Sequence, residues 1–331
     1  MMNFKQYPEV TRIHIPDNLT LINGDFNNAF SNLRNLETLR LSNGITNYAN
    51  MCDTCISLTG EPVCGPNVTN MSGTYSNCIN LTTAVCGDNV TNMSGTYSNC
   101  INLTGSPVCG DKVTDMSGSY YNCRTLTGSP VCGNNVMFMN NAYYACTNLT
   151  GEPVCGENVI SMDSAYFACC NLTGSPICGN NVIYMNYAYF ACYNLTGSPI
   201  CGNNVIYMDY AYSHCYNLTG VPVFGDGVIY INSAYSYCYN LSGGNVYIKN
   251  NYISNVTGCF ASSTSNRLNI YAHKNSNTLG LLLATNNSSL VGNTINWTYA
   301  NIKNEYYFNN ACNIYIYPVD NVAAAKEANG D

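Results

Sequence analysis

Residues 67–82 read N-V-T-N-M-S-G-T-Y-S-N-C-I-N-L-T, and the same sixteen residues return without a change at 89–104. Variants of this phrase continue along the chain, each with a cysteine at the same place. The cysteines are Cys55, Cys78, Cys100, Cys123, Cys146, Cys169, Cys192, Cys215 and Cys238. Seven of the eight intervals between them are 23 residues, and the interval from Cys78 to Cys100 is 22. A strict period of this length predicts a solenoid, in which each unit buries its apolar side only against its neighbours.

The composition favours a protein that works outside the cytosol. Of the 331 residues, 46% are hydrophobic, and only 9% are charged, against about a quarter in an average protein. Asn, Ser, Thr, Gly and 29 tyrosines supply the polarity instead. The net charge of −7 and the total of 11 Lys and Arg argue against nucleic acid as a partner, because affinity for phosphates depends on basic side chains.

The beginning of the chain, MMNFKQYPEV, has neither the basic nor the apolar segment of a signal peptide. No stretch approaches the roughly 18 apolar residues of a spanning helix, so no membrane span is predicted. We therefore expect an extracellular, cell-surface or virion location. It would be reached without a visible signal, as for a phage structural protein released by lysis, or after removal of a leader.

The repeat pattern divides the chain into three parts. Residues 1–50 carry leucine where later units carry cysteine, as expected of divergent N-terminal capping repeats. Residues 51–260 form the predicted 23-residue repeat solenoid, and residues 261–331 a small β-rich C-terminal cap. Three segments of that cap show the period-two alternation of half-buried strands, at 268–272, 295–299 and 314–318. A short helix is expected at Ala323–Ala328.

Counting each repeat from its cysteine as position 0 sorts the residues into columns, with one residue missing from the copy that starts at Cys78. Apolar residues occupy position 3 (Leu), 8 (Val or Ile), 13 (Val), 16 (Met) and 20 (Tyr), and position 19 is Ser, Thr or Ala. We expect these columns and two cysteine columns to build a narrow core. Positions 3–9 are the predicted strand, whose stacked copies would form a parallel sheet at about 4.8 Å spacing.

Proline and asparagine recur at two further positions. Position 7 is proline in seven units, at Pro62, Pro107, Pro130, Pro153, Pro176, Pro199 and Pro222. Because proline cannot donate to a strand ladder, we expect a very short strand or a polyproline-like run. Position 2 is asparagine at Asn80, Asn102, Asn148, Asn171, Asn194, Asn217 and Asn240. These side chains are predicted to stack as an amide ladder that pairs turn backbone, which explains their N-x-[ST] sequons better than glycosylation does.

The phrase at 67–82 resembles the bacterial surface leucine-rich repeats of the BspA type, which read roughly N-V-T-x-M-x-x-M-F-x-x-C-x-x-L-T-x-L-x-L. The spacings from V to M, M to aromatic, aromatic to C and C to L agree over the whole regular array. The resemblance implies a β-rich, arc-shaped, right-handed solenoid of parallel stacked short strands. Its sheet would line the concave face and serve in adhesion, and such repeats also occur in phage tail proteins.

Three departures from that family phrase stand out. Tyrosine replaces the usual Phe, proline enters the strand, and a polar residue or Glu replaces the middle strand Leu, as at Glu61, Ser106, Ser129 and Glu152. We therefore expect a concave face that differs from the family's.

The cysteines form two columns. Those at position 0 include Cys78, Cys100, Cys123, Cys146, Cys169, Cys192 and Cys215, and those at position 9 include Cys109, Cys132, Cys155, Cys178 and Cys201. Phe224 takes the next position-9 slot, a swap that a cysteine bonded in every coil would not tolerate. Structural ladders of buried thiols are therefore favoured over disulfides, and both over metal binding. Cys52-x-x-Cys55 has no partner pair at zinc spacing, and no metal or cofactor is expected.

Other columns vary while the core columns stay constant, and these are predicted to face outward. In the C-terminal half they turn aromatic and form a predicted surface stripe of Tyr184, Tyr187, Tyr207, Tyr210, Tyr230, Tyr193, Tyr216 and Tyr239. Tyrosine offers a large contact area with little entropy loss and a hydroxyl, as recognition surfaces need. Stacked aromatic rings also stabilise neighbouring coils, so packing and binding both remain open as the role of the stripe.

Catalysis has little support. His14, His214 and His273 lie in three different regions, and no phosphate loop, Ser-His-Asp order or His-x-x-x-His motif is present. Asp163 and Asp209 share a column but stand two repeats apart, too far for paired carboxylates. No catalytic site is predicted.

The sequence therefore predicts a non-enzymatic recognition or adhesion protein, such as a phage tail fibre, a receptor-binding protein or a bacterial adhesin. Its partner would be a cell-surface glycan or protein, bound through the tyrosine stripe. The alternative is a homo-oligomeric filament or lattice subunit built by stacking of solenoid ends. A third interpretation, a disulfide-armoured secreted scaffold, requires most of the cysteines to be paired.

Overall fold

The computed structural model describes residues 6–16, 25–59, 61–250, 252–254, 258–260 and 263, together with the backbone of three later strands. The strands are β1 (Arg12–His14), β2 (Thr38–Arg40), β3 (Gly244–Ile248), β4 (Leu268–His273), β5 (Ala300–Asn301) and β6 (Cys312–Tyr317). The predicted strands at 268–272 and 314–318 fall on β4 and β6. The strand predicted at 295–299 and the helix predicted at Ala323–Ala328 lie outside the described residues. The described part of the chain holds no helix long and apolar enough to cross a membrane.

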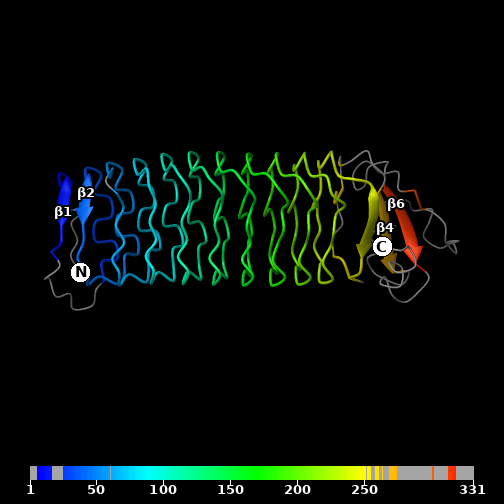
Figure 1. The fold of residues 1–331 in the computed structure, drawn as a ribbon, viewed down its shortest axis with the longest axis horizontal. Helices are drawn as coiled ribbons and strands as arrows, with labels where there is room; N and C mark the ends of the chain where they lie inside the picture. Colours follow the sequence, from blue (N-terminus) through cyan, green and yellow to red (C-terminus); the bar gives the residue numbers. More distant parts are fainter. Residues whose placement is uncertain are drawn as a thin grey trace. The chain divides into compact units, whose positions relative to one another are not determined.

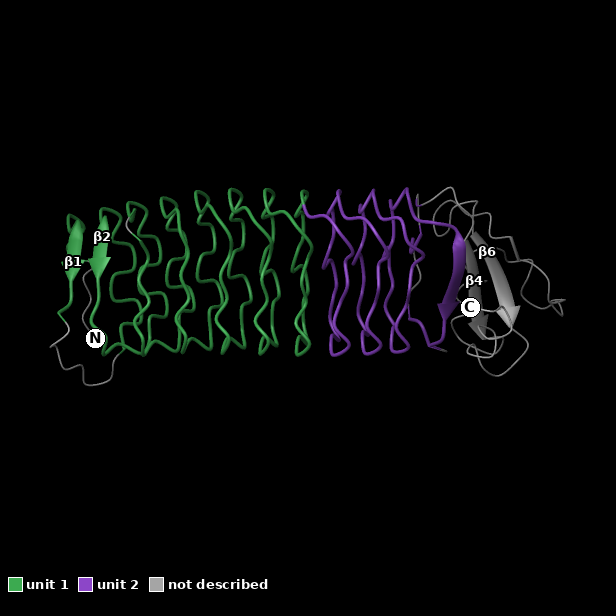
Figure 2. Cartoon of the chain, viewed as in Figure 1, with its two compact units in different colours: residues 1–171 green, residues 172–331 purple. Residues whose placement is uncertain are grey.

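The chain forms two compact units, residues 1–171 and residues 172–331, and each is a series of turns that repeat with the period of the sequence (Figures 1 and 2). In the first unit β1 pairs with β2 in parallel, with Ile13 opposite Leu39. In the second unit the sheet order is β3-β4-β6-β5, and only β5 runs antiparallel to its neighbour. The turns thus repeat with the period of the sequence, while the closed coil and its handedness stay predictions.

In the described interior coils no strand spans all of positions 3–9, in keeping with the very short strand or polyproline-like run expected from the prolines. Strands occur in this part of the repeat only at the two ends of the array, as β2 and β3. There position 7 holds Arg40 and Asn245 instead of proline. In the second unit isolated parallel bridges join Ile177 to Ile200 and Ile200 to Val223, one residue after the proline. A ladder cannot continue through proline in every coil because proline has no N–H to donate.

A buried tyrosine hydroxyl takes over the missing hydrogen bonds in the first unit. Tyr120 Oη donates to Val108 O at 2.7 Å and accepts from Val108 N at 2.8 Å, reaching across the core to the residue that follows Pro107. The same pair of bonds joins Tyr75 to Val63, Tyr97 to Val85, Tyr143 to Val131 and Tyr166 to Val154. These bonds do not require the proline, because Tyr97 makes them with Val85, which follows Ala84. We call this pair of bonds the tyrosine clamp.

Hydrogen bonds between coils come mainly from the turns around positions 16–22. Met71, Gly73, Tyr75 and Asn77 each donate N–H to the next coil at 2.7–2.9 Å, whereas Thr74 N bonds to Met71 O within its own turn. The backbone turns through the left-handed region at Gly73 (φ 60°) and Asn77 (φ 59°). Neighbouring coils are thus joined along a ribbon of turns rather than along the predicted sheet.

The core follows most of the predicted columns. Leu, Val, Met and Tyr at positions 3, 13, 16 and 20 are fully buried in the described regular coils, as in Leu126, Val136, Met139 and Tyr143. The prediction was wrong at position 8, where Ile177 is 49% exposed. The proline at position 7 is buried instead, in the coils of both units.

The amide ladder lies in a different column from the predicted one. At position 2 the structure shows one link, from Asn240 Nδ2 to Asn217 Oδ1 at 3.2 Å. In the first unit the ladder forms at position 22, where Asn99 donates to Asn77 at 3.1 Å and Asn122 donates to Asn99 at 2.9 Å. Asparagine also tolerates the left-handed backbone of that position.

Candidate binding surface

The tyrosines predicted at position 15 form one stack in the second unit. The ring centroids of Tyr184 and Tyr207 are 5.0 Å apart, and those of Tyr207 and Tyr230 are 4.7 Å apart, with interplanar angles of 9° in both pairs. Parallel backbone bridges between the same residues hold them in register. Tyr184, at the start of this stack, is 40% exposed.

The other five predicted tyrosines belong to two more stacks. Tyr187 and Tyr210 lie 4.8 Å apart at an interplanar angle of 5°. Tyr193 lies 4.9 Å from Tyr216, which lies 5.3 Å from Tyr239. Position in the repeat therefore correctly groups the tyrosines into columns, but it does not show which columns meet.

Three residues that the sequence did not single out as site residues, Phe190, His214 and Tyr237, connect the stack of Tyr187 with the stack of Tyr193. Phe190 lies 5.8 Å from Tyr187 and 5.1 Å from His214. His214 lies 4.4 Å from Tyr237 and 5.9 Å from Tyr216. We call the connected set the aromatic cluster, and its members are Tyr187, Phe190, Tyr193, Tyr210, His214, Tyr216, Tyr237 and Tyr239. The signal that could have found His214 and Tyr237 is that position 22 also varies along the chain.

Stacking decides which parts of these rings meet solvent. A ring in the middle of a stack, such as Tyr207 or Tyr216, has both faces against neighbouring rings, so it shows its edge and hydroxyl. At the end of its column Tyr239 is 49% exposed, and Tyr237 meets it edge-on at an interplanar angle of 86°. The rings in the middle of a stack therefore present hydroxyls and ring edges, and the rings at the ends of a stack have one face that no stacked ring covers.

Three tyrosines of the cluster occupy a backbone conformation that disfavours them, and one of them is Tyr237 at φ 59°. Tyr187 has φ 56° and Tyr210 has φ 58°, at the position where Gly73 and Gly118 stand in the first unit. A bulky side chain in this region costs on the order of 1–3 kcal/mol and persists where the surroundings or a function require it. Tyr187 is also 37% exposed, so burial of its ring does not account for the choice.

The cluster is close to electrically neutral. Burial lowers the pKa of His214, whose Nδ1 lies 2.8 Å from Ser213 Oγ, so the ring is uncharged at neutral pH. Burial raises the pKa of the nearby Asp209 carboxyl, and the hydrogen bond that its Oδ1 accepts from Asn232 N at 2.7 Å opposes that rise. Burial, followed by the neighbouring Tyr210, raises the pKa of the Tyr187 hydroxyl.

The cysteines predicted as structural ladders lie inside the coils. Those at position 0 are buried, namely Cys78, Cys100, Cys123, Cys146, Cys169, Cys192 and Cys215. Their thiols donate to the carbonyl of a residue in the preceding coil, as Cys123 Sγ does to Tyr97 O at 3.0 Å. At position 9, Cys109, Cys132 and Cys155 are half-buried, whereas Cys178 and Cys201 are buried. Burial raises the pKa of the Cys109 thiol to about 12, so it stays protonated at neutral pH.

Phe224, in the cysteine slot, is buried edge-on against Tyr235 with centroids 5.5 Å apart. His14 lies in β1, His214 in the aromatic cluster and His273 in β4, so the three histidines belong to separate elements. Within the segments that the structure describes, no three His, Cys, Asp or Glu residues are grouped so that they could hold a metal ion.

Comparison with known proteins agrees with the geometry of the coils. The family model for the BspA type leucine rich repeat region (6 copies) matches residues 2–127 and 116–242. The search of curated proteins finds no match to the chain. The matched residues make up more than half of the sequence and include every regular coil. The chain belongs to the BspA-type leucine-rich-repeat family.

Proposed function

We propose that this protein is a non-enzymatic recognition protein that binds a partner on a cell surface through the aromatic cluster and the adjoining stack of Tyr184, Tyr207 and Tyr230. BspA-type repeat proteins are typically surface-associated and serve in adhesion or protein–protein contact. The low charge and abundant hydrogen-bonding groups of the chain suit an extracellular or virion setting.

The observation that carries this proposal is a pair of tyrosines on left-handed backbone, Tyr187, which is 37% exposed, and Tyr210, which is half-buried. Glycine satisfies the same backbone position in the first unit without strain, as at Gly118. The second unit instead places Tyr187 and Tyr210 there, and their side chains do not fill the core. A binding role explains a costly aromatic residue on the outside better than coil packing does, because glycine serves packing equally well.

The form of the surface favours a protein partner over a glycan at this site. Sugar rings stack on open aromatic faces, and half of the ring faces in the cluster are covered by stacked neighbouring rings. Hydroxyls and ring edges instead complement the mixed polar and apolar surface of a protein, where tyrosine is enriched. Few charges need to be desolvated on binding, since His214 is neutral and Asp209 is hydrogen-bonded.

The test is binding of the purified full chain to a panel of bacterial cells, scored by flow cytometry. The double variant Tyr187→Gly/Tyr210→Gly restores the glycine of the first unit and should keep its circular dichroism spectrum while losing at least tenfold in binding. Protease treatment of the cells should remove binding, and periodate treatment should spare it. The matched control is Tyr144→Ser, in the separate stack of Tyr121, Tyr144 and Phe167. Unchanged binding by the double variant would refute this site.

The filament alternative receives less support. β1 is an edge strand of its sheet in the described residues, and it carries the exposed charged or polar side chains Arg12 and His14. Charged side chains on an edge strand discourage pairing with another copy. Sedimentation velocity over a hundredfold concentration range tests this alternative, since stacking would give a continuous rise in particle mass.

A further inference from the structure

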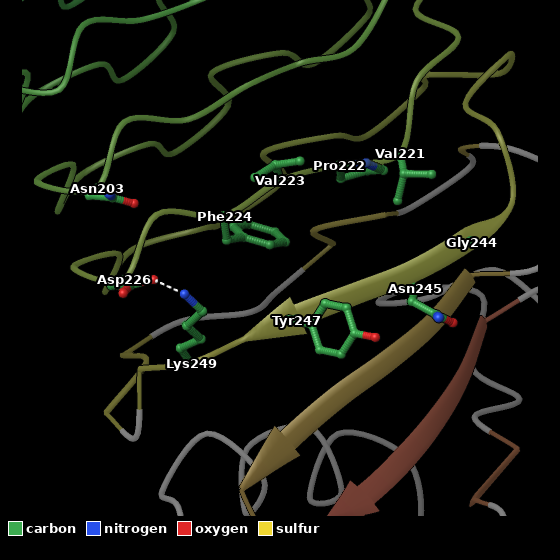
Figure 3. A pocket seen from close by; sticks show the side chains of 10 residues that line it. All are labelled: Asn203, Val221, Pro222, Val223, Phe224, Asp226, Gly244, Asn245, Tyr247 and Lys249. Atoms are coloured by element: carbon green, nitrogen blue, oxygen red, sulfur yellow. Dashed lines mark ion pairs between the residues drawn. The ribbon is translucent and has the colours of Figure 1, made fainter. Parts of the chain in front are cut away.

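A pocket of about 700 Å³ opens in the second unit between the segment 221–226 and strand β3 (Figure 3). It lies away from the aromatic cluster, because it is built from positions 6–11 of one repeat and the equivalent part of the next. The core tyrosines show that these positions face the opposite side of the coil. Tyr212 Oη, for example, crosses the core to reach Ile200 O at position 8, at 3.4 Å.

The pocket exists because β3 leaves the stacking pattern of the coils before it. Parallel bridges join Ile177, Ile200 and Val223 in succession, and Val223 is the last described member of that series. β3 is the edge strand of the four-stranded sheet and pairs with β4 on its other side. Phe224 fills the core beneath the gap, edge-on to Tyr235 and Phe260.

Both ends of the pocket are narrow. At one end Lys249 Nζ lies 2.7 Å from Asp226 Oδ1. At the other end Gly244 contacts the Val221 side chain so closely that a Cβ on the glycine would lie 2.7 Å from Val221 Cγ2. A peptide strand running through the groove would have to break the ion pair, so the shape suits a compact ligand.

The lining combines an apolar wall with uncharged polar groups. Val221, Pro222 and Val223 form the wall, and Val223 is 44% exposed. Across from them, Tyr247 and Asn245 extend from β3 toward the opening, and Asn203 stands at the end that the ion pair also occupies (Figure 3). The charges of Lys249 and Asp226 offset each other, so the pocket has no net charge with which to attract an ionic ligand.

We propose that this pocket binds a neutral pyranose unit of a glycan. A pyranose has an apolar C–H face, which fits the wall of valines and proline and the ring of Tyr247. Its hydroxyls both donate and accept hydrogen bonds, as the carboxamides of Asn203 and Asn245 do. The volume lies within the 300–1,000 Å³ that is usual for small-ligand pockets, and an apolar lining with a few polar groups is typical of them. Such a site would give the protein a second contact with a glycosylated surface, independent of the aromatic cluster.

The experiment is titration of the full chain with glucose, galactose, mannose and N-acetylglucosamine, followed by saturation-transfer NMR, with sialic acid as the acidic comparison. At least one neutral sugar should bind in the millimolar range, and sialic acid should not compete with it. Val223→Trp, which fills the pocket from an exposed position, should weaken binding at least tenfold, and Asn203→Ala at least threefold. The matched control Ile177→Trp changes the same repeat position outside the pocket and should bind as the unchanged protein does.

The aromatic-cluster variant Tyr187→Gly/Tyr210→Gly should also bind the sugar normally, which separates this inference from the proposed function. The inference fails if no neutral sugar binds, if sialic acid binds in preference, or if Val223→Trp has no effect on binding.

Discussion

The regular coils of the two units bury the same residue types at the same repeat positions. The backbone at position 8 makes its hydrogen bonds in a different way in each unit. In the first unit the clamp from Tyr120 both donates to and accepts from Val108, at 2.7 and 2.8 Å. In the second unit Tyr189 and Tyr212 donate to Ile177 O and Ile200 O at the longer distances of 3.3 and 3.4 Å, and backbone bridges between coils join the same segment. Position 8 then faces solvent and position 9 is buried, as Ile200 and Cys201 show. One repeat phrase therefore supports two hydrogen-bonding solutions.

The two units also differ in the residues at the outward-facing repeat positions. Where the first unit has Gly73 and Gly118, the second has Tyr187 and Tyr210 on the same left-handed backbone. The core beneath them does not change, because Met and Tyr at positions 16 and 20 stay buried in both units. A solenoid of this kind can thus change its surface in one part without altering the packing that holds it together.

The largest expected effect is on the tyrosine clamp. Tyr120→Phe leaves the N–H and C=O of Val108 without their partner and should lower the free energy of unfolding by about 2 kcal/mol. Tyr212→Phe removes one long hydrogen bond from a segment that bridges also hold, so its cost should stay below about 1 kcal/mol. Urea denaturation followed by circular dichroism measures both, and amide hydrogen exchange at Val108 reports the local loss. Equal costs for the two variants would remove the distinction between the units.

At left-handed backbone positions, removing a glycine should destabilise the first unit, and introducing a glycine should stabilise the second. Gly118→Ala has room for the added Cβ, whose nearest contacts are at 4.0 Å, so only backbone strain should count, at about 1 kcal/mol of destabilisation. Ser233→Gly, at φ 52°, should stabilise the second unit by up to about 1 kcal/mol. Thermal denaturation of the two variants tests this, and a stabilising Gly118→Ala would contradict it.

The thiols at position 9 should react differently in the two units. Cys109 is half-buried with its pKa raised to about 12, and Cys132 has its pKa raised to about 11, so both should be alkylated at least tenfold more slowly at pH 8 than an ordinary exposed thiol. Their rates should rise as pH approaches those values. Cys178 and Cys201 are buried and should stay unmodified in the folded protein. Mass spectrometry after iodoacetamide gives the rates, and disulfide-linked peptides without reductant would revive the armoured-scaffold interpretation.

The smallest effect concerns His214 in the aromatic cluster. Its pKa in the folded protein lies below the unfolded value of about 6.5, because burial disfavours the charged ring. Protonation therefore favours unfolding, so its contribution is intact above about pH 6.5 and is lost as pH falls below that value. Its ring neighbours are Phe190, Tyr216 and Tyr237, none of them charged at these pH values. The thermal midpoint between pH 7.5 and 5.5 should fall slightly more for the unchanged protein than for His214→Gln.

The fold could be predicted from the sequence as far as spacing carries information. A period of 23 residues with Leu, Val, Met and Tyr at constant positions specifies one buried side per coil, which the structure contains. Spacing does not reveal which backbone groups pair between coils, so the burial expected at position 8 was wrong, and only the prolines indicated that any strand at positions 3–9 would be very short. The recurrence of tyrosine twelve residues after the valine at position 8 held the necessary signal, because these two residues form the clamp.

The sequence could predict which repeat positions carry the tyrosines of the candidate site, but not which rings contact one another. Variation along the chain separated the eight tyrosines from the core, yet Phe190, His214 and Tyr237 join them only through neighbouring coils. Glycine at position 18 of the first unit could have warned that tyrosine there is strained. The pocket beside β3 had one visible trace, the replacement of a cysteine by Phe224, and that residue gives no sign of the space above it.

The tyrosine clamp has a consequence for how such a chain can change in length. Val108 and Tyr120 stand twelve residues apart in the same coil, as do Val85 and Tyr97 in the copy that lacks one residue. Each of these coils thus pairs the backbone of this valine with a tyrosine of its own. Whole copies can be gained or lost in the first unit without leaving any neighbour short of a partner on that side, so copy number is a property that duplication and deletion can adjust freely.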